Sequence, residues 1–137
     1  MGFANFGVVS FTDQSKVSDF VTYLEEGKVM TTKCKKCGSR FFPPRADCPD
    51  CINSEVEWFA IEDTGKLVTY TTVNYGPSGF ENDAPYSLAI VDFSDGLRVF
   101  GRICKEIDAS EIKIGMELKL AASASGTERV GYEFRKA

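Results

Sequence analysis

The sequence contains no histidine, and this absence limits the chemistry that the chain can perform. Histidine is the most common general base in enzymes, and it completes the Ser-His-Asp and Cys-His catalytic arrangements and most catalytic zinc sites. Acid or base catalysis would have to use Asp, Glu, Lys, Tyr or Cys instead. We therefore predict that the chain has no catalytic residues and is not an enzyme on its own.

Long apolar runs are also absent. No run reaches the length of about 18 residues that a helix needs to cross a bilayer. The first residues have neither the basic start nor the long apolar stretch of a signal peptide. These absences predict a cytoplasmic protein with no membrane contact, in which thiols remain reduced. Paired cysteines are then expected to bind a metal rather than to form disulfides.

Positive charge is scarce. Sixteen Lys and Arg residues face twenty Asp and Glu residues, which gives a net charge of −4. Proteins that bind nucleic acid usually carry a basic surface, because neutralising phosphates supplies much of their affinity. Only residues 31–51 are locally basic, with five cations and two acids. The charge therefore argues against a nucleic-acid partner.

Residues 13–26 have the apolar spacing of an amphipathic helix. Thr12 or Asp13 stands where an N-terminal cap belongs, and Gly27 stands where a C-terminal cap belongs. The apolar positions follow the i, i+3, i+4, i+7 pattern: Val17, Phe20, Val21 and Leu24. We expect this stripe to pack on the rest of the chain or, alternatively, to bind a partner.

From Val56 onward the sequence is typical of strands and turns. Alternation and β-branched residues predict five barrel strands: Lys66–Tyr75, Tyr86–Phe93, Leu97–Cys104, Met116–Leu120 and Val130–Phe134. The Asp95-Gly96 pair predicts a hairpin turn between the second and third strands. Between the third and fourth, Ile107, Ile112 and Ile114 suggest a short helical plug. Five strands with an insert at this point is the layout of an OB-fold barrel.

Four of the five cysteines form two Cys-x-x-Cys pairs: Cys34, Cys37, Cys48 and Cys51. Two intervening residues allow both thiolates of one turn to bind a single ion, at about 2.3 Å from each sulfur. Two such pairs complete a tetrahedron with no open position for water, which is typical of a structural site. We predict one structural Zn²⁺. A rubredoxin-like iron site and a thiol redox pair are the alternatives.

The fifth cysteine, Cys104, ends a predicted strand and is expected to be a small buried residue. Its alternative role is the nucleophile of a self-sufficient acyltransferase or thiolase. The predicted fold is mainly β. It consists of an N-terminal helical segment (1–28), a rubredoxin-like zinc ribbon (29–60) and a five-stranded OB-fold barrel (61–137).

The run from Cys34 to Cys51, with Phe41-Phe42-Pro43-Pro44-Arg45 between the cysteine pairs, resembles the acyl-CoA-associated zinc-ribbon/OB-fold family known as Domain of Unknown Function 35. The segments Gly65–Val73 and Ala84–Val91 are similar to its first two barrel strands. The resemblance implies a non-catalytic accessory subunit in a hetero-oligomer with a thiolase-superfamily enzyme. A subunit of a hotdog-fold enoyl-CoA hydratase is the alternative partner. Such subunits help to bind or channel the acyl-CoA thioester, in β-oxidation-like degradation of aromatic compounds or steroids, or in mevalonate synthesis.

Three residues are candidates for CoA binding. Arg45 lies in the basic segment, and a guanidinium group pairs well with phosphate. Phe80 and Tyr86 lie in or next to expected loops and would line the pantetheine arm. The alternative is that the cations are solvated and the aromatic rings, including Phe41 and Phe42, are packed inside. A single-stranded nucleic-acid-binding OB-fold, in which aromatic rings stack on bases, is the second function class.

Overall fold

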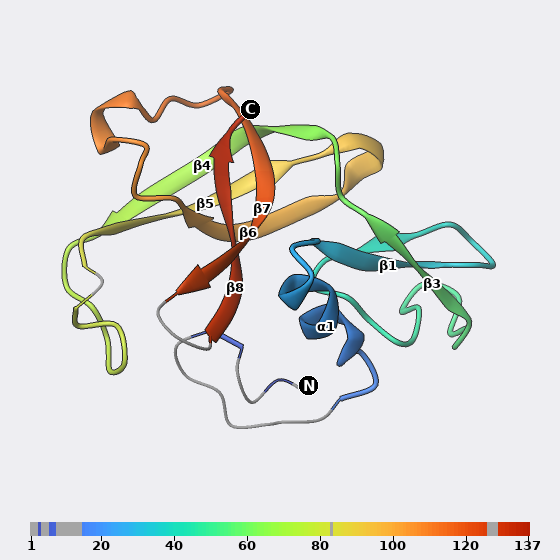
Figure 1. Ribbon diagram of the computed structural model, residues 1–137. Helices are drawn as coiled ribbons and strands as arrows, with labels where there is room; N and C mark the ends of the chain where they lie inside the picture. Colours follow the sequence, from blue (N-terminus) through green and yellow to red (C-terminus); the bar gives the residue numbers. More distant parts are fainter. Residues whose placement is uncertain (1–2, 4–5, 8–14, 83, 126–128) are drawn as a thin grey trace.

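The chain forms a short helix, a three-stranded ribbon sheet and a five-stranded barrel, in that order (Figure 1). The structure is a computed structural model that describes residues 3, 6–7, 15–82, 84–125 and 129–137. The elements are α1 (Asp19–Glu25), β1 (Met30–Cys34), β2 (Arg40–Phe41), β3 (Val56–Ala60), β4 (Thr64–Val73), β5 (Tyr86–Asp92), η2 (Ser94–Gly96), β6 (Arg98–Ile103), η3 (Ala109–Glu111), β7 (Glu117–Ser125) and β8 (Arg129–Lys136). The predicted mainly β fold class is confirmed.

The helix begins later than predicted. The expected cap residues, Thr12 or Asp13, lie outside the described residues. The predicted start of the helix is nevertheless wrong, because residues 15–18 form a turn and α1 begins at Asp19. The Ser18 hydroxyl donates to the Ser15 carbonyl at 2.7 Å, and the Ser15 amide donates back to that hydroxyl at 2.8 Å. Such local side-chain bonds compete with helical hydrogen bonding.

The end of α1 agrees with the sequence. Gly27 has a φ of 83°, and its N–H donates to the Leu24 carbonyl at 2.9 Å. The Lys28 N–H donates to the Tyr23 carbonyl at 2.8 Å, which completes a Schellman cap. Phe20, Val21 and Leu24 are buried, so the apolar stripe packs on the same chain. The alternative expectation, that this stripe binds a partner, is wrong.

The ribbon sheet has the order β2-β1-β3, and both pairings are antiparallel. β1 pairs along its whole length with β3, from Met30 with Ala60 to Cys34 with Val56. The ribbon's own small core consists of Cys34, Phe41 and Cys48, with Cys51 and Val56 packed against it. So small a core cannot hold the segment together alone, which is the situation in which a bound metal stabilises a fold.

The barrel is closed in the order β4-β5-β6-β8-β7, and only the β6–β8 pairing is parallel. β4 pairs with β5 along most of its length and with β7 at its start, with a register shift between Leu67 and Thr69. Gly65 is required at this crossing. A Cβ atom there would lie 2.6 Å from Val91 Cγ1 and 2.8 Å from the Asp92 carbonyl oxygen. The predicted Asp95-Gly96 turn is confirmed, and both residues have positive φ.

The insert between β6 and β7 is a single 3-10 turn, η3, with Ile107 and Ile112 buried beneath it. Ile114, which we expected in the same plug, is 63% exposed. Ile114 and Gly115 are the central residues of a turn closed by the Met116 N–H, which donates to the Lys113 carbonyl at 3.1 Å, and Gly115 has a φ of 87°. The predicted plug is therefore correct for two of its three isoleucines.

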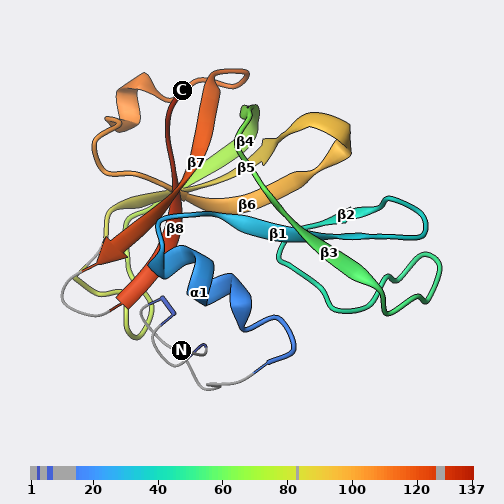
Figure 2. The same cartoon turned by 45° about the vertical axis from the view of Figure 1, so that its right-hand side comes forward.

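The helix, the ribbon and the barrel share one core. α1 packs against β8 of the barrel and β1 of the ribbon (Figure 2). An aromatic cluster, which we define as Phe3, Phe6, Phe20, Phe42 and Tyr132, joins the N-terminal segment, α1, the ribbon loop and β8. Arg40 adds a polar link, because it stacks on Phe59 at 4.8 Å and pairs with Asp95 at 3.0 Å. The ribbon is therefore fixed against the barrel.

Among the described residues, no helix has the length and apolar character needed to cross a membrane.

Candidate metal centre

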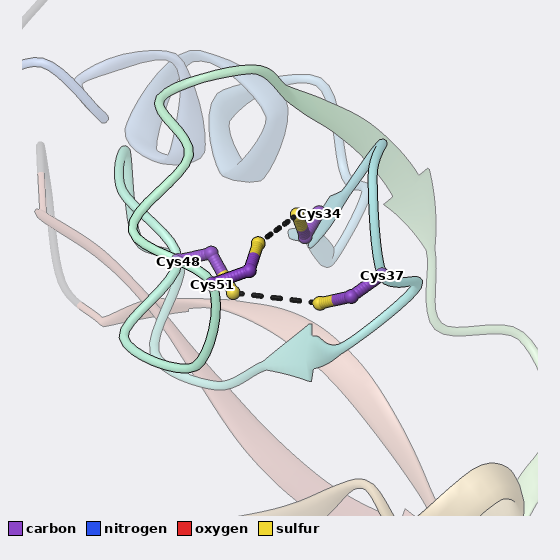
Figure 3. Close-up of side chains that lie close together, drawn as sticks. All are labelled: Cys34, Cys37, Cys48 and Cys51. Carbon is purple, nitrogen blue, oxygen red and sulfur yellow. Dashed lines mark hydrogen bonds between the residues drawn. The ribbon is translucent and has the colours of Figure 1, made fainter.

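The four paired cysteines lie together at one end of the ribbon (Figure 3). Their Sγ atoms all lie within 4.8 Å of one another. Cys34 Sγ lies 3.5 Å from Cys51 Sγ, and Cys37 Sγ lies 3.6 Å from Cys48 Sγ. Four sulfurs at 2.3 Å from a tetrahedral ion would be separated by about 3.8 Å. The side chains therefore fit a four-coordinate ion.

Two turns with the same hydrogen-bond pattern deliver these sulfurs. In the first knuckle, residues 34–39, the Cys34 N–H donates to the Ser39 carbonyl at 2.8 Å, and the Gly38 N–H donates to the Cys34 carbonyl at 3.0 Å. In the second knuckle, residues 48–53, the Cys48 N–H donates to the Asn53 carbonyl at 2.9 Å, and the Ile52 N–H donates to the Cys48 carbonyl at 2.9 Å. Ile52 thus occupies the place of Gly38, and both have positive φ, 55° and 77°.

Polar groups around the sulfurs orient them. The Lys36 backbone N–H donates to Cys34 Sγ at 3.4 Å, and the Asn53 side-chain Nδ2 lies 3.8 Å from the same atom. On the exposed side, Cys37 Sγ lies 3.2 Å from the Ser39 hydroxyl, which donates to the Asp50 carboxylate at 2.9 Å. Outer groups of this kind fix ligand geometry in metal sites.

The local environment favours the thiolate form of two cysteines. The backbone amide of Cys37 lowers the pKa of Cys34 to about 6. The Ser39 hydroxyl lowers the pKa of Cys37. In contrast, burial raises the pKa of Cys51 to about 12, so in the absence of a metal this thiol keeps its proton at neutral pH. Binding of a metal would release that proton, because only thiolates coordinate it.

The arrangement is closed and suits a structural role. Cys34 and Cys48 are buried, Cys51 is half-buried and only Cys37 is exposed. All four positions of a tetrahedron are supplied by the chain, which leaves none for a substrate. Cys104 lies outside this group. It is buried at the end of β6, and its N–H donates to the Phe134 carbonyl at 2.9 Å.

The residues predicted to bind CoA fall into two places. Arg45 is exposed in the loop between β2 and β3, where its guanidinium lies over the Phe41 ring at 5.9 Å from the ring centroid. Phe80 and Tyr86 lie together at the start of β5, with ring centroids 6.2 Å apart. The loop between β4 and β5 and the loop between β2 and β3 lie well apart in both views (Figures 1 and 2). Of the aromatic rings expected in loops, Phe41 and Tyr86 are buried.

Sequence reasoning missed Arg102 and a cavity beside it. The Arg102 guanidinium lies 4.5 Å from the Tyr86 ring centroid and 5.8 Å from that of Phe80. A cavity of about 650 Å³ opens at this end of the barrel, and Tyr86, Ile103, Cys104 and Ile107 are among its lining residues. The β5–β6 hairpin register could have indicated which residues lie near Arg102, because Arg102 pairs with Leu88, two residues after Tyr86.

The closed four-cysteine site and the barrel define a zinc-ribbon/OB-fold protein, and comparison with known proteins identifies its family. The model for the ChsH2 rubredoxin-like zinc ribbon domain matches residues 22–57, and that for the ChsH2 C-terminal OB-fold domain matches residues 58–123. A DUF35 domain-containing scaffold protein of Methanocaldococcus jannaschii is 35% identical over 112 residues, which cover 75% of this chain and 77% of that protein. The chain belongs to the DUF35 family, as its sequence motifs indicated.

Two further similarities concern enzyme assemblies. The benzoylsuccinyl-CoA thiolase subunit BbsA of Thauera aromatica is 29% identical over 109 residues, which cover 76% of this chain and 73% of that subunit. A chain of the Ltp2-ChsH2(DUF35) aldolase has the same fold, with a TM-score of 0.76 and 20% identity. That similarity covers 92% of this chain and 98% of the aldolase chain.

Proposed function

We propose that this chain is a non-catalytic accessory subunit of a cytoplasmic thiolase-like complex that acts on acyl-CoA thioesters. The observation that carries the proposal is the similarity to the thiolase subunit BbsA across 76% of the chain. The closed four-cysteine site supports it, because the most reactive groups of the chain are arranged for structure and not for turnover.

In this proposal one Zn²⁺ binds Cys34, Cys37, Cys48 and Cys51 and holds the two knuckles together. Zn²⁺ supplies folding free energy to a segment whose own core is too small to fold alone. The chain's own residues set the position and orientation of the ribbon. β1 and β3 carry the knuckles, and the Arg40 ion pair with Asp95 and the packing of Phe59 on the main core hold the ribbon against the barrel. The partner enzyme therefore meets a ribbon of fixed orientation.

The acyl-CoA thioester is proposed to be shared with the partner. The cavity at the barrel end has the size range of a small-molecule site and is bordered by Tyr86, near the Arg102 guanidinium. A pantetheine arm would lie along Phe80 and Tyr86. Arg45, on the separate ribbon loop, would contact the phosphates of CoA only if the partner brings that end of the ligand across to the ribbon. The pathways proposed are degradation of aromatic compounds or steroids, or mevalonate synthesis.

The test is to co-express the chain with the thiolase-superfamily enzyme encoded nearest to its gene and to measure their association by analytical ultracentrifugation. We expect a defined hetero-oligomer. Affinity of the complex for CoA is then measured by calorimetry for wild type, Phe80→Ala and Arg45→Ala. We expect weaker binding for both variants, with the assembly unchanged. An enzyme that remains soluble and active with no association would contradict the accessory role. Unchanged CoA affinity in both variants would contradict only the residue assignments.

A further inference from the structure

Ile52 has a backbone conformation that is unfavourable for its residue type. Its φ is 55°, in the left-handed region, where branching at Cβ makes isoleucine a genuine outlier. The matching position of the first knuckle is Gly38, which adopts the same region at no steric cost. Strained residues of this kind persist where the surrounding structure determines them, and they gather at functional positions. The second knuckle therefore keeps an isoleucine where glycine would fold more easily.

Packing of the Ile52 side chain within the protein does not offset this backbone strain. It is 89% exposed, so burial of its surface contributes almost nothing to folding. The aliphatic side chain is therefore available for a contact outside the chain. The Ile52 backbone is fixed in position. Its N–H donates to the Cys48 carbonyl, and Cys48 and Cys51 both belong to the metal site.

The segment that carries Ile52 is acidic. Residues 47–57 contain four acids and neither Lys nor Arg. Asp47, Asp50 and Glu55 are exposed. The first knuckle has the opposite character, since Lys35 and Lys36 are exposed there. A surface complementary to the second knuckle would therefore be apolar at its centre and basic around it.

We propose that Ile52 is an apolar anchor that inserts into a pocket, flanked by Lys or Arg side chains, on the surface of the thiolase-like enzyme. This inference rests on the proposed function and names the contact by which the ribbon would bind that enzyme. A rigid backbone that presents an exposed aliphatic side chain lowers the ordering cost of binding. A small number of such anchors usually carries most of the affinity of an interface.

The test distinguishes an effect on binding from an effect on folding. Loss of the anchor should lower affinity for the enzyme, whereas relief of the backbone strain should preserve or raise thermal stability. Ile52→Asn and Ile52→Gly both remove the aliphatic side chain and both tolerate positive φ. We expect the zinc content to stay at wild-type level and the melting temperature to be equal or higher. The Kd for the thiolase-superfamily enzyme encoded nearest to the gene should rise by about tenfold or more. The matched control is Ile114→Asn, at an isoleucine that is 63% exposed on the barrel, which should leave the Kd unchanged.

Charge is tested by Asp47→Lys, which should also weaken binding without loss of zinc. If wild type does not bind the enzyme at all, the proposed function is wrong and the anchor is wrong with it. If wild type binds and Ile52→Asn binds equally well, only the anchor is wrong. If the Ile52 variants lose zinc or thermal stability in parallel with affinity, the residue acts through folding and the anchor is also wrong. Unchanged binding by Asp47→Lys would overturn the basic rim.

Discussion

Tyr132 provides a quantitative test of the packing that joins the helix, the ribbon and the barrel. Its ring lies in the aromatic cluster, 5.1 Å from Phe42 and 6.2 Å from Phe20, and its hydroxyl donates to the Phe100 carbonyl at 2.9 Å. Burial raises the pKa of Tyr132 from 10.0 to about 12. The folded chain therefore holds the phenolic proton more tightly than the unfolded chain does.

The raised pKa makes stability depend on pH in a defined direction. Below pH 10 the phenol is neutral in both states, and its full contribution to stability is present. As the pH rises from 10 towards 12, the unfolded chain ionises first and stability falls, by up to about 2.7 kcal/mol once both pKa values are passed. At pH 11 the loss is about 1.4 kcal/mol. Tyr132→Phe cannot ionise, but it loses the hydrogen bond to Phe100, which costs about 1 kcal/mol.

We expect the two stability curves to cross. Urea unfolding at pH 8 should show Tyr132→Phe to be less stable than wild type by about 1 kcal/mol. The difference should vanish near pH 11, at about the point where the ionisation loss equals the hydrogen-bond loss. Fluorescence of Trp58, the only tryptophan, reports the transition from β3. Other ionising groups are common to both proteins and cancel in the difference. Curves that stay parallel from pH 8 to 11.5 would refute the burial of this phenol.

Two further predictions concern the cysteines. Cys37→Ser should lower the zinc content below one ion per chain and unfold the ribbon, seen by elemental analysis and Trp58 fluorescence. The barrel should persist, because it supplies most of the buried residues of the shared core. A metal-free protein with an unchanged fold would contradict the structural role. Cys104→Ala should keep the zinc, because Cys104 lies outside the metal site. Turnover of the assembled complex should stay at the wild-type rate, because alanine keeps a small apolar side chain in the cavity lining and the chain has no histidine to activate the thiol. Abolished turnover in an intact Cys104→Ala complex would instead make Cys104 a nucleophile.

The parts of the fold that depend on local patterns could be predicted from the sequence. The Cys-x-x-Cys spacing determines the knuckles, because each closes within six residues through its own backbone hydrogen bonds. The Asp95-Gly96 turn and the alternation in β5 and β6 likewise need only near neighbours. The end of β7 was missed because the run from Ala121 has no contrast between apolar and polar positions. That run is a strand only because it pairs with β8, up to Ser125 with Arg129.

One local turn, one long-range arrangement and one backbone conformation could not be predicted. Ser15 and Ser18 bond to each other instead of continuing the helix. The separation of the loop that carries Arg45 from the loop that carries Phe80 follows from the placement of the ribbon beside the barrel. The strain at Ile52 was also hidden, because the sequence shows Gly38 after the first cysteine pair and does not show that residue 52 must adopt the same conformation.

The most direct test of the accessory role is a turnover measurement on three preparations: the isolated chain, the thiolase-superfamily enzyme alone, and the two purified as a complex. An acetoacetyl-type CoA thioester and free CoA are the two substrates, and release of acyl-CoA product is followed under identical conditions. We expect no turnover by the isolated chain and a higher rate for the complex than for the enzyme alone. Turnover by the isolated chain, or an enzyme whose rate and solubility do not change when the chain is present, would contradict the accessory role.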